Sequence, residues 1–144
     1  MAKLEELEKL WETDSKIDRT ELDTESLKIP TLHSKYYKLY LREKVQLKAE
    51  EQEYKQFYKL KHEYYTGKLS KSELDGYGWE PFQFVLKNDL IVYMESDKEL
   101  SERLLKLHVQ REKVDFLADI IKTLNTRGFL IKNAIDFIKF TSGN

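Results

Sequence analysis

Apolar residues recur at spacings of three and four along most of this 144-residue chain, which is the period of amphipathic helices. The first such pattern places Leu4, Leu7 and Leu10 on one side of a short helix over residues 3–12. Small polar residues with helix-capping chemistry follow this helix. Residues 14–29 are therefore expected to form an irregular linker that contains one helical turn.

A long helix is predicted to begin at Pro30 and to run to about Thr66. Proline is tolerated in the first turn of a helix, and Gly67 can adopt the left-handed conformation that ends one. A stripe of lysines borders one broad face of this helix. Aromatic and aliphatic residues gather on that face, and they are Leu32, Tyr36, Leu39, Tyr40, Leu47, Tyr54, Phe57, Tyr58 and Tyr65.

The segment that follows is expected to be less regular. Gly76 and Gly78, followed by Pro81, predict a loop. Two short apolar runs, at residues 84–86 and 90–93, then flank three turn-forming residues. Short β-prone runs in this arrangement predict a short β-hairpin near residues 84–93.

A second long helix is predicted from about Asp97, because mostly apolar residues alternate spacings of four and three along it, as in a heptad seam with two polar interruptions. The residues of this seam are Leu100, Leu104, Leu107, Arg111, Val114, Ala118, Ile121 and Asn125. Residues 125–128 are expected to end it, and residues 129–140 to form a terminal helix. A second apolar strip lies beside the seam, and a helix that is apolar on two sides needs more than one neighbour. We therefore expect an oligomer interface formed by Leu104, Leu107, Val114, Ala118, Ile121, Phe129, Ile131 and Ile135.

These patterns predict a mainly α-helical fold of a single domain over residues 1–144. Five glycines and two prolines are few for a chain of this length, and this scarcity favours long helices over a turn-rich β fold. Within the domain, residues 1–96 carry the basic helix and are expected to bind DNA. Residues 97–144 are expected to serve oligomerisation.

Several classes of chemistry find no support in the residues. The chain has no cysteine, and its three histidines lie far apart without ligand spacing. It also lacks a glycine-rich phosphate loop and a nucleophile elbow. We therefore expect no catalytic residue, no metal and no cofactor. The amphipathic N-terminus is unlike a signal peptide and no apolar run is long enough to span a membrane, so a cytoplasmic location is expected, in the host cell if the protein is viral.

The distribution of charge along the chain is more informative about function than the net charge. The formal net charge of the chain is −1, yet residues 31–71 hold ten lysines and arginines against five glutamates. Cations with aromatic rings between them suit single-stranded nucleic acid, because the cations release the counterions condensed on its phosphates and unstacked bases stack on the rings. The candidate DNA-binding residues are Lys59, Lys61, Lys55, Lys48, Lys44, Tyr64, Tyr65 and Tyr58.

Other interpretations of this helix stay open. Tyrosines at helical spacing also form cores and interfaces, and lysines on a long helix also serve only to solvate it. The chain would then be a non-enzymatic coiled-coil adaptor or scaffold without nucleic-acid binding. A small nuclease or regulatory subunit is a third alternative.

Two segments resemble a known family. Residues 59–67, Lys-Leu-Lys-His-Glu-Tyr-Tyr-Thr-Gly, are similar to a segment of the UvsY-type recombination mediator proteins of T4-like phages. Residues 127–132, Arg-Gly-Phe-Leu-Ile-Lys, followed by Asp136 and Phe140, resemble a second segment of that family. The chain departs from the family in having Lys61 where arginine can stand and His62 where an aliphatic residue can stand.

The resemblance implies a factor of DNA recombination, repair and replication that forms a ring-like homo-oligomer. Such a protein binds single-stranded DNA, helps to displace the phage single-strand-binding protein, and loads a RecA-like recombinase. The two basic positions that bind DNA in the family fall on Lys59 and Lys61. The C-terminal helical region serves assembly in the family, which agrees with the seam.

Overall fold

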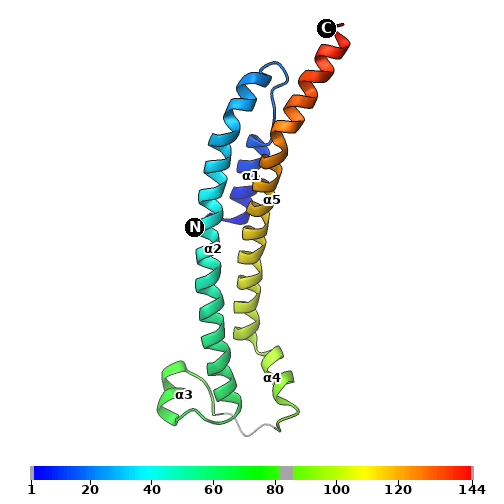
Figure 1. The fold of residues 1–144 in the computed structure, drawn as a ribbon. Coiled ribbons are helices and arrows are strands. Elements are labelled where there is room, and N and C mark those ends of the chain that lie inside the picture. The colour runs from blue at the N-terminus through cyan, green and yellow to red at the C-terminus, as the bar shows by residue number, and fades with distance from the viewer. Residues whose placement is uncertain (1, 82–85, 144) are drawn as a thin grey trace. The chain divides into compact units, whose positions relative to one another are not determined.

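A computed structural model describes residues 2–81 and 86–143 of the chain. Within them lie five helices: α1 (Leu4–Asp14), α2 (Leu22–Tyr65), α3 (Lys71–Tyr77), α4 (Leu90–Ser96) and α5 (Lys98–Thr141) (Figure 1). The expected mainly α-helical fold is confirmed. The contacts divide into two compact units, residues 1–46 with 109–144, and residues 47–108. The expected roles of residues 1–96 in DNA binding and of residues 97–144 in oligomerisation concern function and stay predictions.

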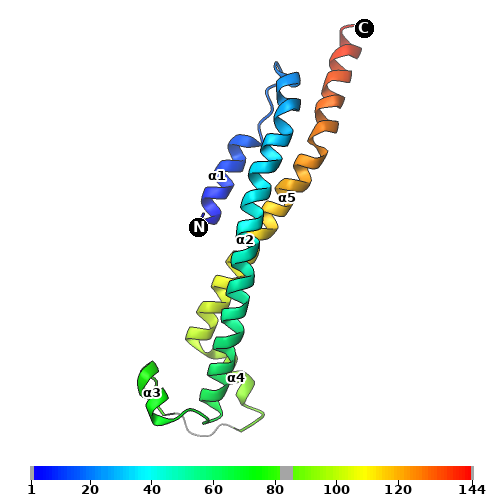
Figure 2. The ribbon, with the colours of Figure 1, turned by 60° about the vertical axis from the view of Figure 1, so that its left-hand side comes forward.

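The first unit is held by an apolar core between α1, the first part of α2 and the last part of α5, and α1 lies alongside α2 in both views (Figure 2). The buried side chains of this core are Leu7, Tyr36, Leu117, Ile120 and Leu124. On α5 these residues recur at spacings of three and four, so one stripe of the helix faces the core.

Three buried polar side chains of this unit, Glu43, Gln110 and Lys113, are paired with one another. The amide of Gln110 donates to the backbone oxygen of Glu43 over 2.9 Å and to its carboxylate over 2.6 Å. The ammonium of Lys113 lies 3.3 Å from the same carboxylate and donates to the backbone oxygen of Ala2 over 2.8 Å. A buried carboxylate is tolerated only with such partners, so the carboxylate of Glu43 helps to set the register of α2 against α5 in this unit.

The second unit contains the end of α2, the short helices α3 and α4, and the start of α5. Its core is formed by Phe57, Tyr65, Met94 and Leu100. Rings of α2 and the segment after α3 extend this core outward. Gly67, at φ 71°, ends α2, and the amide of Lys68 donates to the carbonyl of Glu63 over 2.9 Å, closing the turn that left-handed glycine permits. The predicted stop of the long helix is thus confirmed.

Four local predictions need correction. Residues 90–93 are part of the helix α4, so the β-hairpin is wrong, while Phe84 and Val85 of its first run lie outside the described residues. Most of the predicted loop at 75–78 belongs to α3, which ends at Tyr77 and is capped by Gly78 at φ 70°. The linker at 14–29 is helical from Leu22, so Pro30 lies inside α2 and does not begin it.

The fourth correction concerns α5, which runs through the predicted stop at residues 125–128 without a break. Leu124 and Ile131 are both buried, and a turn between them would take one of the two out of the core. A glycine inside a helix costs about 1 kcal/mol relative to alanine. Burial of these two side chains outweighs that cost, and the helix continues through Gly128.

Replacing Pro30 by alanine is expected to raise the free energy of unfolding by about 1–2 kcal/mol. Pro30 has no N–H to donate to the carbonyl of Ser26, and proline inside a helix costs up to about 3 kcal/mol, partly offset by its stiffening of the unfolded chain. Urea unfolding measures the change. Thr31→Ala at the next exposed position is the control, and an unchanged midpoint for Pro30→Ala would show that residues 22–29 add nothing to the stability of α2.

Candidate nucleic-acid interface

The predicted lysine stripe lies along α2 with its side chains exposed. Lys48, Lys55 and Lys59 belong to the second unit and all three reach solvent. Lys44 is exposed in the first unit, where its ammonium lies 5.5 Å from the centre of the Tyr40 ring. These four lysines therefore present cations at the surface of α2, as a phosphate-binding surface requires.

Lys61 is placed differently, because only 3% of its surface is exposed. Its ammonium lies 3.0 Å from the carboxylate of Asp97 and 3.4 Å from that of Glu99. It also lies 4.0 Å from the centre of the Trp79 ring and 5.4 Å from that of Tyr64, within range of cation–π attraction. The positive charge of Lys61 is thus neutralised inside the second unit by carboxylates of the same chain.

Asp97 joins the end of α2 to the start of α5. One oxygen of its carboxylate accepts the N–H of Leu100 over 2.8 Å and so caps α5. The other accepts the hydroxyl of Tyr65 over 2.6 Å and faces Lys61. Burial raises the pKa of Asp97, but the hydrogen bonds from Tyr65, Leu100 and Lys61 outweigh it and leave the pKa below its usual value. Burial, followed by the bond to this carboxylate, raises the pKa of Tyr65.

The three candidate tyrosines have different surroundings. Tyr65 is buried in the core of the second unit, so its ring packs against protein. Tyr64 is partly buried, and its hydroxyl donates to the backbone oxygen of Glu80 over 2.8 Å. Tyr58 is 45% exposed and lies beside Tyr54, with ring centres 6.2 Å apart. Of the three, Tyr58 has the ring most open to a nucleobase.

Sequence reasoning missed three residues that shape this surface: Tyr77, Trp79 and Arg103. The Trp79 indole donates to the Glu99 carboxylate over 3.1 Å, and the guanidinium of Arg103 lies 3.7 Å from the centre of the Phe57 ring. No periodic pattern marks Tyr77 and Trp79, because they come from a segment outside the long helices. Arg103 lies on α5 itself, at an exposed position outside its apolar stripe.

The residues predicted to form the oligomer interface divide by burial. Leu107, Val114 and Ile131 are buried within the chain, and Ile121 packs against the core of the first unit. Leu104, Ala118 and Ile135 are half-buried. Phe129 is 69% exposed, and other exposed apolar side chains of the last part of α5 are Leu130, Phe137, Ile138 and Phe140. The predicted interface residues therefore serve partly within one chain. Most exposed apolar side chains of α5 lie after residue 128, and two more, Leu105 and Val109, lie in its first part.

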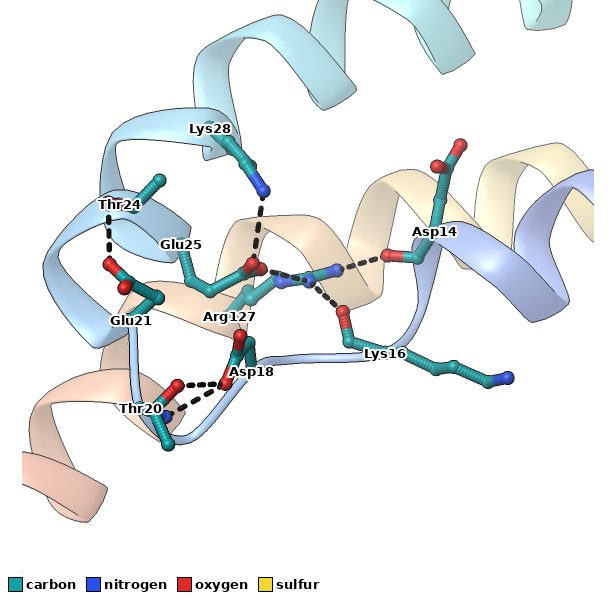
Figure 3. Close-up of polar contacts among 9 residues, drawn as sticks. All are labelled: Asp14, Lys16, Asp18, Thr20, Glu21, Thr24, Glu25, Lys28 and Arg127. Atoms are coloured by element: carbon teal, nitrogen blue, oxygen red, sulfur yellow. Dashed lines mark hydrogen bonds and ion pairs between the residues drawn. The ribbon is translucent and has the colours of Figure 1, made fainter.

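Arg127, from the second segment of the resemblance, anchors the connection between α1 and α2 (Figure 3). Its guanidinium donates to the backbone oxygens of Asp14 over 2.8 Å and Lys16 over 3.0 Å, and it lies 3.3 Å from the carboxylate of Glu25. Both Arg127 and Glu25 are buried. The role of Arg127 in the first unit is thus to position one loop and close the end of α1.

The described part of the chain contains no helix with the length and apolar character needed to cross a membrane.

The helical fold of the chain is shared with crystal structures of the recombination mediator protein UvsY of bacteriophage T4. In lattice type II the TM-score is 0.84 at 24% identity, over 99% of both chains. In lattice type IV it is 0.80 at 22% identity, over 97% of this chain and 99% of the other. In lattice type I it is 0.80 at 23% identity, over 94% and 98%.

No curated protein sequence matches the chain significantly. The model of the family described as "Recombination, repair and ssDNA binding protein UvsY" matches residues 10–144. The chain therefore belongs to the UvsY family, as the two segments suggested.

Proposed function

We propose that this protein is a recombination mediator, which binds single-stranded DNA and promotes loading of a RecA-like recombinase onto strands covered by single-strand-binding protein. The observation that carries the proposal is the match of the family over residues 10–144. The exposed lysines of α2 next to aromatic rings support it, because phosphates and unstacked bases need both kinds of group. The proposed role is one of binding and exchange and includes no catalytic step.

Assembly of several copies gives this role its physical basis. One chain offers a few exposed lysines on α2, which supports only weak, salt-sensitive binding. A ring repeats that surface, so that one strand contacts several subunits and affinity rises without new kinds of contact. We propose that the exposed apolar residues of α5 after residue 128 join subunits of a homo-oligomer. Their exposure in the single chain supports this assignment.

Replacing Lys55 and Lys59 together by alanine is expected to weaken binding of single-stranded DNA and to flatten its dependence on salt. Each lost phosphate contact lowers the slope of log affinity against log salt by about 0.7. Fluorescence anisotropy with a labelled oligonucleotide, at several salt concentrations, measures both quantities. Lys9→Ala, on the exposed surface of α1, is the matched control and should leave the slope unchanged.

The outcomes separate the proposal from its main alternative. If the wild-type protein fails to bind the oligonucleotide even at low salt, a scaffold or adaptor without nucleic-acid binding is the better description. If the wild type binds and the double variant keeps both its affinity and its slope, DNA contacts a surface other than the one around Lys55 and Lys59. Native mass spectrometry with and without the oligonucleotide then reports the number of subunits that take part.

A further inference from the structure

Two aromatic rings after α2 form a stacked pair. Gly78, at φ 70°, reverses the chain after α3, and the N–H of Trp79 donates to the carbonyl of Leu74 over 3.0 Å. This turn lays Trp79 against Tyr77, with ring centres 4.7 Å apart and ring planes 24° from parallel. Only a residue that tolerates positive φ allows such a turn, so the pair depends on glycine at position 78.

The inner ring of the pair is fixed from several sides. The indole N–H of Trp79 donates to Glu99 over 3.1 Å, and the buried ammonium of Lys61 lies 4.0 Å from the centre of its ring. Tyr64 packs against it with ring centres 5.1 Å apart. Trp79 is therefore a rigid support, and a ring stacked on a rigid support binds a ligand with little loss of conformational entropy.

The outer ring, Tyr77, is 51% exposed and borders a hollow of about 430 Å³. Lys59 and Arg103 supply cations to the lining of this hollow, while Glu53 and Glu63 supply carboxylates. The carboxylates offset the cations, so a bare phosphate gains little inside. A flat base suits the hollow better, because it stacks on a ring and its edge carries both donors and acceptors.

We propose that Tyr77 is a stacking site for a nucleobase of single-stranded DNA, with Lys59 holding a neighbouring phosphate at the rim of the hollow. This inference rests on the proposed function and adds a named contact to it. It also assigns Lys61 a role as a positioning residue, since its ammonium supports Trp79 from inside the second unit and Trp79 supports Tyr77.

The test compares the affinities for two probes, a fluorescein-labelled oligo(dT) and a labelled strand of equal length made of abasic residues. Wild-type protein should bind oligo(dT) more tightly than the abasic strand. Tyr77→Ala should reduce that preference about tenfold, equal to about 1.4 kcal/mol, while binding of the abasic strand stays as in wild type. Tyr77→Phe, which keeps the ring, should keep the preference, and Tyr77→Leu should lose it.

Tyr37→Ala is the matched control, because Tyr37 is 44% exposed and also stacks on a neighbour, His33, but belongs to the first unit. It should leave the preference unchanged. The inference fails if Tyr77→Ala alters binding of both probes equally or of neither, with circular dichroism showing a folded protein. Wild-type protein that binds neither probe would instead refute the proposed function itself.

Discussion

Replacing Lys61 by alanine is expected to lower the free energy of unfolding by about 3 kcal/mol. The carboxylate of Asp97 is buried, and removal of its cationic partner leaves it uncompensated, which typically costs about 3–5 kcal/mol. The change also removes the cation beneath Trp79. Urea-induced unfolding followed by circular dichroism measures the loss, and fluorescence of the tryptophans reports the rearrangement around Trp79.

Two further variants test whether the loss of stability comes from the buried ion pair of Lys61 with Asp97. Lys59→Ala removes an exposed lysine two residues earlier and should change stability by less than about 0.5 kcal/mol. The double variant Lys61→Met with Asp97→Asn should be more stable than Lys61→Met alone, because a neutral amide still caps α5 without needing a cation. Equal stability of Lys61→Ala and Lys59→Ala would mean that the ammonium of Lys61 reaches water, and a direct contact of Lys61 with DNA would then be favoured.

Replacing Arg127 by alanine is expected to cost about 3 kcal/mol and to release the connection between α1 and α2. The variant leaves the carboxylate of Glu25 buried with one partner fewer and takes the donor from the carbonyls of Asp14 and Lys16. Chemical unfolding measures the loss of stability. Hydrogen exchange should show faster exchange confined to residues 15–21 before the whole unit opens.

A second partner of Glu25 offers the control for this prediction. Lys28 lies 3.1 Å from the same carboxylate, but its side chain is 55% exposed. Exposed ion pairs contribute about 0–1 kcal/mol, so Lys28→Ala should have a much smaller effect than Arg127→Ala. Similar losses for both variants would show that the carboxylate of Glu25 is stabilised as much from the solvent side as from α5.

Helical periodicity predicted the α-helical fold, the approximate end of α2 and the start of α5, because these depend on local spacing and on Gly67. Periodicity failed where tertiary packing overrides local preference. Pro30 and Gly128 both suggested boundaries, yet the helices continue through them. Buried side chains lie on both sides of each position, Glu25 and Tyr36 around Pro30, and Leu124 and Ile131 around Gly128. The run at 90–93 was too short for its period to separate strand from helix.

The candidate site was predictable only in part. The cationic character of α2 follows from composition, and the exposure of Lys55 and Lys59 agrees with it. Which lysine faces inward depends on groups that only the fold brings together. Asp97 and Trp79 meet Lys61 from positions 36 and 18 residues away, and nothing in the spacing of the lysines distinguishes Lys61 from Lys59.

Under the proposed binding of single-stranded DNA, the inward position of Lys61 also bears on the rate of association with a strand. Long-range steering acts through charges that stand in water, where it raises the rate of association and is screened by salt. A cation neutralised by two carboxylates of its own chain exerts almost no field at a distance. Under the proposed function, we therefore expect the outward lysines of α2 to govern the rate of encounter with DNA. Lys61, which supports Trp79 from inside the second unit, is expected to affect how long the strand stays bound.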